Sequence, residues 1–391
     1  MFGFLRMGTT GLAAQEFGAG AIEEVATIFM RAVVIALVLG GLIVTLQWPL
    51  HLLLFGLFSS SQEVQDLAAA YYHIRIWGAP ALLVHLVQLG ILFALQRMRD
   101  TLILSVGLNM TNLVLDILFV LGFGWGVEGV ALATLVSEWG AMFIGLVLVV
   151  RALKTNHWQG FQSWRQKQPK LWNMLAAKRL FHVSSNLVLR TFFVQLPFFV
   201  GTLVASNLRA IESANHDLVL AVHGVLMQLF FVMTYALDGF AHTAETLTGF
   251  AYGAKSPKQL RQATLYSCVW CLLLALFIAG NFWLAGDFYV SWLTTSPEIQ
   301  NTATSYMPWL VIAPFFCLLA FVFDGIFIGT THIVEMRNSM ILAVIVWAAC
   351  LWLSFDSLGY HAVWLSTIVF MLVRSALLGY YYPKIEQGAY G

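Results

Sequence analysis

The feature that most constrains this chain is a series of long apolar runs, each about as long as a bilayer's hydrocarbon core is thick. A membrane-spanning helix needs about 20 mostly apolar residues, and the 391-residue chain contains ten such runs. They lie near residues 25–48, 71–96, 102–123, 127–150, 180–205, 217–240, 262–285, 304–331, 339–355 and 361–382. The runs lack the period-two alternation of barrel strands. They predict an all-α polytopic membrane protein.

Composition supports the same class. Charged residues make up 10% of the chain, against about 25% in an ordinary soluble domain. Such a chain cannot build the charged surface that keeps a soluble protein dispersed. This excludes a soluble enzyme, a nucleic-acid binder and a disordered protein, and it makes membrane lipids the surroundings of the chain.

The connecting segments alternate in charge. Basic residues follow every second full run, and the stretch 151–179 holds seven of them and no acid. Most of the other connections carry acids, such as Glu63 and Asp287. Because cytoplasmic loops are enriched in Lys and Arg, we expect residues 151–179 and the C-terminus to be cytoplasmic.

An internal repeat relates the two halves at one constant offset, which carries position 61 to position 296. The strongest match pairs residues 61–65 (SQEVQ) with residues 296–300 (SPEIQ), and Gly90-Ile91 also matches Gly325-Ile326. The offset covers an even number of apolar runs, so the halves have parallel topology. The repeat therefore predicts two pseudo-symmetric six-helix bundles related by an axis along the membrane normal.

The repeat also predicts the division of the chain. Residues 1–150 form a first lobe, residues 151–179 a cytoplasmic linker, and residues 180–391 a second lobe. With a slip of three residues, Met98-Arg99 matches Met336-Arg337. The second half begins near residue 176, so the offset predicts that roughly 60 residues of the first lobe precede Met1 in the complete protein. These are its first helix and most of its second, and Met1 is then an internal methionine or a misplaced start.

Polar residues inside a membrane span are costly and are functional candidates. In the first half, Asn109, Asn112 and Asp116 share one helix face. Thr134 and Glu138 lie one turn apart on the next run. Carboxylate, amide and hydroxyl oxygens suit Na⁺, and a carboxylate also holds a proton. A cation- or proton-coupling site is favoured, and a polar helix–helix contact is the alternative.

The second half carries further candidates for coupling or for a substrate cavity. Asp238, His242 and Glu245 share one helix face, and two acids flanking a histidine suggest proton handling or attraction of a cation. Asp324 lies deep in an apolar run, and Arg190 begins another run, where it lines a cavity or pairs with an acid. The spans hold few basic residues, chiefly Arg31, Arg75, Arg190 and Arg374.

Four segments resemble one known family. They are residues 5–19 (LRMGTTGLAAQEFGA), 235–245 (YALDGFAHTAE), 324–330 (DGIFIGT) and 335–340 (EMRNSM). They look like the DinF-like branch of the multidrug and toxic compound extrusion (MATE) transporters, which belong to the MOP superfamily. The resemblance covers essentially the whole chain, with motifs at corresponding places in both halves.

The resemblance implies a two-lobed exporter of the bacterial cytoplasmic membrane in which H⁺ or Na⁺ entry drives drug exit. Asn112, Asp116 and Thr134 match the family's cation site on its fifth and sixth helices, which implies that they couple to H⁺ or Na⁺, and no metal other than Na⁺ is expected. Asp324 matches an acidic position that some branches use for the cation, and Asp238 belongs to the branch's eighth-helix motif. The family's other N-lobe acid stands on the first helix, which this chain lacks.

We therefore expect a secondary active antiporter of small organic compounds, cationic or amphipathic, that works by alternating access. It is expected to be a monomer, to have no enzymatic activity, and to need no cofactor beyond its coupling ion. Two alternatives stay open. A lipid-linked saccharide flippase of related design would favour a cavity rich in basic residues. The chain as given could also be a truncated fragment without transport activity.

Overall fold

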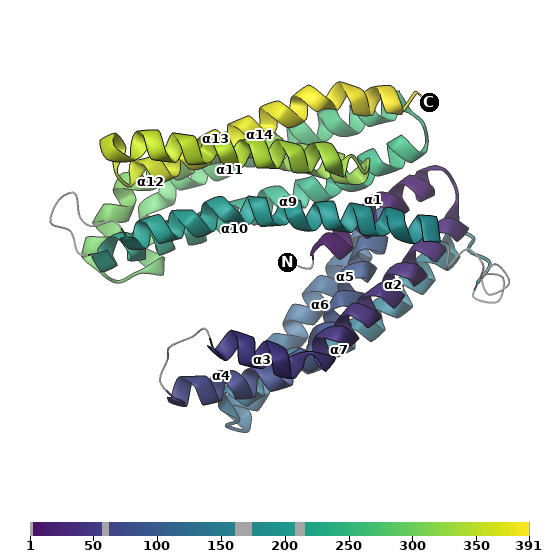
Figure 1. Ribbon diagram of the computed structural model, residues 1–391, viewed down its shortest axis with the longest axis horizontal. Helices are drawn as coiled ribbons and strands as arrows, with labels where there is room; N and C mark the ends of the chain where they lie inside the picture. Colours follow the sequence, from purple (N-terminus) through teal and green to yellow (C-terminus); the bar gives the residue numbers. More distant parts are fainter. Residues whose placement is uncertain (1–2, 57–61, 161–173, 208–215, 391) are drawn as a thin grey trace. The chain divides into compact units, whose positions relative to one another are not determined.

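The computed structural model describes residues 3–56, 62–160, 174–207 and 216–390. Every element in these ranges is helical (Figure 1). The chain divides into two compact units, Phe2–Leu180 and Phe181–Gly391. Residues 161–173, within the predicted linker 151–179, lie outside the described residues.

The first unit is built around α5 (Ala79–Ala94), whose Ala81, Val87 and Ile91 are fully buried. A single turn of 3-10 helix, η1 (Ile76–Gly78), precedes it, and Pro80 stands in its first turn, where a missing N–H costs nothing. α5 packs against α1, α2 and α7. The other helices are α1 (Gly3–Gly18), α2 (Ile22–Thr45), α3 (Gln47–Gly56), α4 (Gln62–Arg75), α6 (Met98–Asp116) and α7 (Gly126–Thr155), with a π-helical segment η2 (Ile117–Gly122) after α6.

The second unit is built around α12 (Pro297–Gly329), which packs against α10, α11 and α14. It also contains most of α9 (Met174–Asn207), and α10 (His216–Gly253), α11 (Pro257–Leu293), α13 (Ile333–Leu358) and α14 (His361–Gly388). Ser256 begins α11, because its hydroxyl accepts the N–H of Gln259 and Pro257 follows it.

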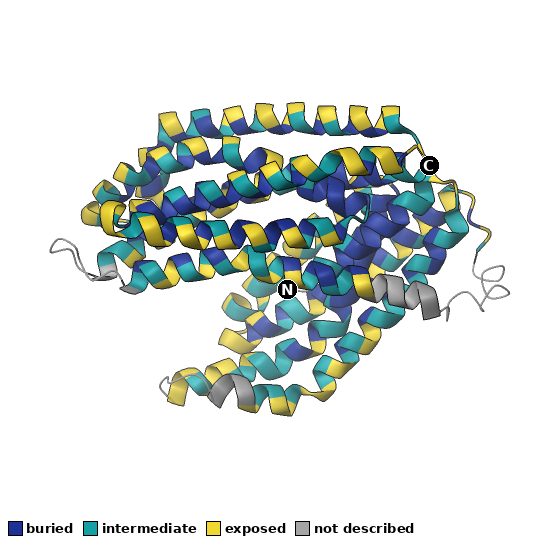
Figure 2. Ribbon diagram, turned by 45° about the horizontal axis from the view of Figure 1, so that its top comes forward, coloured by how far each residue is buried: buried dark blue, intermediate teal, exposed yellow. Residues whose placement is uncertain are grey.

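Ten helical stretches of the described chain are long and apolar enough to cross a membrane, and each overlaps one predicted run. Large apolar side chains such as Trp283, Trp292 and Phe277 are exposed on their outer faces, and exposed residues recur along the helices in Figure 2. A bilayer, unlike water, favours such exposure. The predicted polytopic class is confirmed.

Several observed helices are longer than the predicted runs, most clearly α10. The predicted run 217–240 ends too early, since the helix continues to Gly253. The mean hydropathy falls after residue 237 because polar side chains become frequent there, which is why the predicted run ends early. The backbone hydrogen bonds that hold the helix together do not depend on side-chain polarity. Asp238, His242 and Glu245 consequently stand on one continuous helix.

The backbone repeats at the predicted offset, the one that carries position 61 to position 296. α2 and α11 begin at Ile22 and Pro257, α5 and α12 end at Ala94 and Gly329, and α6 and α13 begin at Met98 and Ile333. Turn residues with positive φ follow the same rule, with φ values of 74° and 50° at Gly20 and Lys255, 57° and 58° at Gln96 and Thr331, and 73° and 52° at Gly124 and Gly359. The same offset separates the two members of every pair.

The predicted slip of three residues is therefore wrong, because Met98 corresponds to Ile333 and not to Met336. A shift of three residues is close to one helical turn of 3.6 residues. It leaves each side chain near the same helix face, so a local match cannot expose the error.

One close helix contact is built identically in both units. A Cβ on Gly90 of α5 would lie 2.8 Å from the carbonyl oxygen of Arg6 on α1. A Cβ on Gly325 of α12 would collide with the carbonyl oxygen of Ala241 on α10, and Ala241 is the counterpart of Arg6 at the repeat offset. Glycine at these positions lets two helices approach backbone to backbone, as small residues do in membrane proteins.

Candidate functional site

The polar face of α6 meets α7 at one point. The Asn112 side-chain amide donates to the hydroxyl oxygen of Thr134 at 3.2 Å. Asn109, one turn earlier, is exposed, and its amide donates to the carbonyl oxygen of Ser105 in its own helix. Of the three polar residues predicted on this face, Asn112 and Asp116 are half-buried.

Asp116 stands where the α-helix changes into the π-helical segment η2. Single π turns occur mostly inside helices and often at functional sites. The Oδ1 atom of Asp116 is buried and has no hydrogen-bond partner among the described residues. Asn112, Asp116 and Thr134 thus bring amide, carboxylate and hydroxyl oxygens to neighbouring turns, a donor set that suits Na⁺ or a proton on the carboxylate.

Glu138 lies one turn beyond Thr134 on α7 and is already occupied. Its two carboxylate oxygens accept from Nη1 and Nη2 of Arg75 on α4 at 2.8 and 2.9 Å. Such a two-point pair is strong and directional. A Cβ on Gly78 would collide with the same carboxylate, so the turn after α4 leaves room for the pair.

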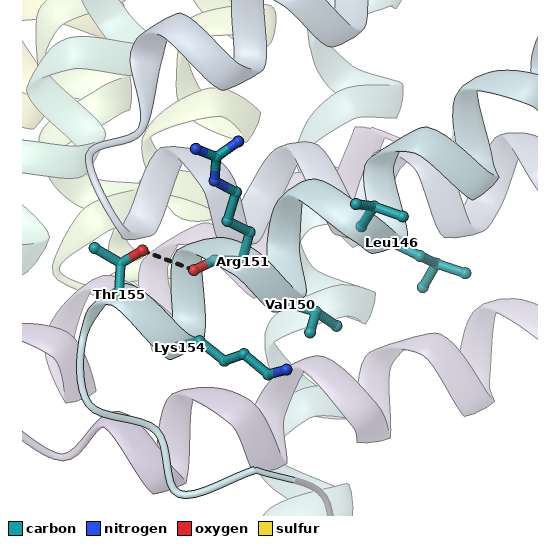
Figure 3. A pocket seen from close by; sticks show the side chains of 6 residues that line it. Leu146, Val150, Arg151, Lys154 and Thr155 are labelled. Atoms are coloured by element: carbon teal, nitrogen blue, oxygen red, sulfur yellow. Dashed lines mark hydrogen bonds between the residues drawn. The ribbon is translucent and has the colours of Figure 1, made fainter.

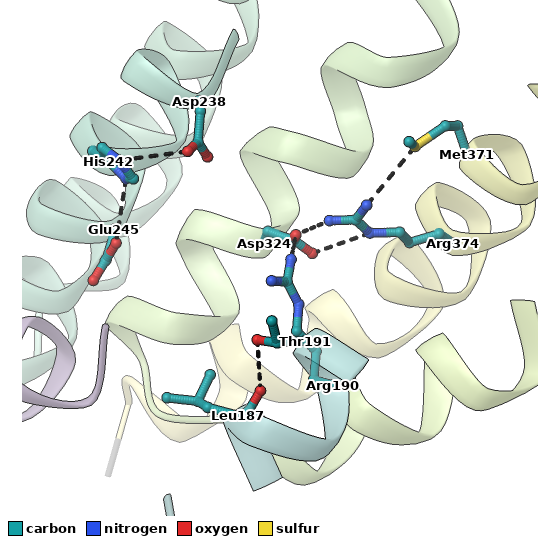
Figure 4. Close-up of polar contacts among 9 residues, drawn as sticks. All are labelled: Leu187, Arg190, Thr191, Asp238, His242, Glu245, Asp324, Met371 and Arg374. Atoms are coloured by element: carbon teal, nitrogen blue, oxygen red, sulfur yellow. Dashed lines mark hydrogen bonds and ion pairs between the residues drawn. The ribbon is translucent and has the colours of Figure 1, made fainter. Parts of the chain in front are cut away.

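Asp324 in the second unit is enclosed by two arginines (Figure 4). Its carboxylate pairs with Arg190 of α9 and Arg374 of α14, and all three side chains are buried. The Arg374 Nε donates to Oδ1 at 3.3 Å, and its guanidinium also lies 5.7 Å from the centre of the Phe321 ring. Of the two roles predicted for Arg190, lining a cavity or pairing with an acid, the structure shows the second. The two arginines neutralise the Asp324 carboxylate.

Asp238, His242 and Glu245 form a row along α10 (Figure 4). The Nε2 atom of His242 lies 3.6 Å from Asp238 Oδ2, and its Nδ1 atom lies 3.8 Å from Glu245 Oε2. The side chains are 43%, 23% and 1% exposed for Asp238, His242 and Glu245. The row therefore runs from an exposed position on the helix into the interior of the unit.

Sequence reasoning missed the partners of two arginines. Arg75 and Arg374 stand out in the sequence as rare cations within apolar runs, yet their acids lie 63 and 50 residues away. In the part of the chain that the structure describes, no three His, Cys, Asp or Glu side chains are grouped to hold a metal ion.

Two surface pockets lie away from these residues. One of about 710 Å³ lies beside the end of α7 and is lined by Leu146, Val147, Val150, Arg151, Lys154 and Thr155 (Figure 3). A second, of about 330 Å³, lies between α9 and α10 and is lined by Phe198, Phe231, His223 and their neighbours. His223 there bridges Thr202 and Tyr360 at 3.1 and 2.8 Å. The predicted coupling residues line neither pocket.

Known proteins resemble the chain over nearly its whole length. It is 36% identical to DNA damage-inducible protein F of Escherichia coli (strain K12), over 96% of this chain and 79% of that protein. It is 22% identical to Multidrug and toxin extrusion protein 1 of Homo sapiens, over 94% of this chain and 59% of that protein. It thus spans little more than half of that longer relative.

Solved structures share the fold. One described as the outward-facing conformation of a multidrug resistance MATE family transporter of the MOP superfamily has a TM-score of 0.83 at 20% identity, covering 99% of this chain and 84% of that chain. A MATE crystal structure in the bent conformation has a TM-score of 0.81 at 19% identity, covering 99% and 84%. A family model described as MatE matches residues 1–118 and 186–353, well over half of the chain. With the ten apolar helices, the duplicated backbone and the DinF relative, this places the chain in the MatE family of membrane transporters.

Proposed function

We propose that the chain is a secondary active antiporter that exports organic compounds, cationic or amphipathic, in exchange for H⁺ or Na⁺. The observation that carries the proposal is a polar group on α6 and α7, in which the Asn112 amide contacts the Thr134 hydroxyl. One turn after Asn112, Asp116 has a buried carboxylate oxygen at the start of a π turn. The extrusion activity named for the human relative supports export as the direction.

Coupling requires that the ion and the substrate prefer different states of the transporter. A proton on Asp116, or a Na⁺ held by Asp116 with its two neighbours, neutralises a charge that is costly inside the membrane. A proton-motive force near 150 mV is worth roughly 3.5 kcal/mol per charge, at about 2.3 kcal/mol per 100 mV. That sustains a substrate gradient of a few hundredfold, at about 1.4 kcal/mol per tenfold.

The flippase alternative is not favoured by the contacts. It calls for a cavity rich in basic residues, but three of the four arginines noted in the spans face carboxylates. Arg75 pairs with Glu138, and Arg190 and Arg374 share Asp324. Carboxylates therefore offset the charge of Arg75 and one of the two charges around Asp324, which leaves fewer free charges to attract a phosphate.

We also propose that the protein acts as a monomer in the bacterial cytoplasmic membrane, with the segment 151–179 and the C-terminus in the cytoplasm. The alternation of basic and acidic connections supports this orientation. Single cysteines at Lys154 and Lys384, probed with an impermeant thiol reagent on cells, should be labelled only after the membrane is opened.

The test of transport is ethidium efflux from proteoliposomes carrying the purified chain, with a pH gradient or a Na⁺ gradient imposed separately. We expect efflux with one of the two gradients and none for Asp116→Asn. The matched control is Asp356→Asn, an exposed acid near the end of α13, and it should behave as wild type. Unchanged efflux in Asp116→Asn would refute the assigned site, and no efflux in the wild type would favour the fragment alternative.

A further inference from the structure

The row on α10 has an unusual arrangement of hydrogen-bond acceptors. Both ring nitrogens of His242 face carboxylate oxygens, from Asp238 at 3.6 Å and Glu245 at 3.8 Å. A neutral imidazole has one donor and one acceptor, whereas an imidazolium has two donors, and ionised carboxylates only accept. Both carboxylates therefore accept a hydrogen bond from this ring at the same time only when the ring carries a second proton.

The row also has a direction. Exposure falls from 43% at Asp238 to 23% at His242 and 1% at Glu245. The inner end is held firmly, because a Cβ on Gly329 of α12 would collide with the carbonyl oxygen of Glu245. A proton arriving at the exposed carboxylate thus has a fixed, buried carboxylate two steps inward.

The first unit contains the same helix–helix contact without the three titratable residues of the row. At the repeat offset, the first-unit counterparts of Asp238, His242 and Glu245 are Gly3, Met7 and Thr10 on α1. Helix α1 makes the same glycine-mediated contact with α5 that α10 makes with α12. The helix pair consequently forms without titratable groups at these three positions, so packing does not explain an acid–histidine–acid row in the second unit.

The surrounding charges leave room for one proton. Helices α11 and α12 pack against α10, and they carry the buried thiols Cys271 and Cys317. Asp324 of α12 holds Arg190 of α9 and Arg374 of α14 as its partners. Counted with the row, three carboxylates face two guanidiniums. One proton on the row makes the set electrically neutral, which a low-dielectric interior favours.

We infer that Asp238, His242 and Glu245 form a proton-binding relay in the second unit, separate from the Asp116 site, that loads one proton during the transport cycle proposed above. A proton taken up by Asp238 Oδ2 passes to Nε2 of His242, and the ring releases its Nδ1 proton to Glu245 Oε2. The ring ends neutral, and the net change is one proton moved from an exposed to a buried carboxylate. A water molecule or a small side-chain rotation closes each gap.

Histidine ¹⁵N NMR of the full chain in lipid nanodiscs tests the relay without needing transport. His242→Gln identifies the His242 signal by its loss, and His361→Gln, an exposed histidine, removes a different one. We expect Asp238→Asn and Glu245→Gln each to lower, by about one pH unit or more, the pH at which the His242 ring loses its second proton. The control Glu298→Gln, an exposed acid at the start of α12, should leave that pH unchanged.

Transport supplies the second readout. Asp116→Asn should abolish ethidium efflux while leaving the His242 titration intact, whereas His242→Gln should flatten the pH dependence of efflux. A titration of His242 that neither acid variant moves would overturn the relay, even if Asp116→Asn confirms the transport proposal. Because Asp238 is the exposed member, Asp238→Asn keeps the test available if the variant of buried Glu245 does not fold.

Discussion

Removing the charge of Asp324 should be among the most destabilising isosteric changes in the protein. The carboxylate is the shared partner of Arg190 and Arg374, whose side chains are 9% and 2% exposed. Breaking a buried ion pair by removing one partner costs about 3–5 kcal/mol, because a charge stays buried without compensation. Here Asp324→Asn leaves two guanidiniums close together, so we expect a loss near the upper end of that range.

Two other ion pairs provide graded controls in the same molecule. Arg75 is 22% exposed, so Glu138→Gln should cost about 1–2 kcal/mol, which is the value of a charged hydrogen bond reduced by solvent screening. Arg261 is 62% exposed in its pair with Glu386, and Glu386→Gln should cause no measurable loss. The cost should thus follow the burial of the arginine.

Denaturant unfolding of the detergent-solubilised protein measures this order. Adding Arg374→Met to Asp324→Asn removes one stranded charge and should recover part of the lost stability. Uncompensated buried charge does not set the cost if Asp324→Asn is no more destabilising than Glu138→Gln, or if the double variant is less stable than Asp324→Asn alone.

Three further outcomes are expected. Gly325→Ala and Gly90→Ala should each destabilise by about 1–3 kcal/mol, since the added methyl meets a backbone carbonyl, whereas Gly239→Ala, which meets open space, should not; equal unfolding midpoints for all three would contradict the close contact. Burial lowers the pKa of His332, with the charge of Glu335 opposing the shift. The unfolded chain then takes up a proton near pH 6.5 that the folded state resists, so stability should fall as the pH drops through about 6.5, and less steeply in His332→Gln. Thr134→Val should weaken ion coupling while changing the free energy of unfolding by no more than about 1 kcal/mol, and unchanged ion dependence of efflux would count against its role.

The membrane class and the spans were predictable because a bilayer imposes a length and a composition on each crossing segment. The duplication was predictable too, and the backbone bears out its offset down to single turn residues such as Gln96 and Thr331. Helix ends were less predictable. Polar residues such as His242 lower hydropathy without ending a helix, so α10 extends past the predicted run.

Candidate polar residues could be picked out by their cost inside a span, but their roles could not be ranked. Asp116, Glu138 and Asp324 look alike in sequence, each an acid in an apolar run. In the structure, Glu138 and Asp324 are occupied by arginines, and Asp116 keeps a buried oxygen without a partner among the described residues.

The sequence by itself determined that the protein lies in a membrane, that it is helical and that its two halves repeat. Each of these follows from local composition and periodicity or from direct repetition. Tertiary structure alone decided which acid meets which cation. Asp324 pairs with Arg190 and Arg374, which are 134 and 50 residues away in the sequence. The three side chains meet because of how their helices are oriented about their own axes when they pack. Helical periodicity places a side chain on a face, but only packing decides what that face meets.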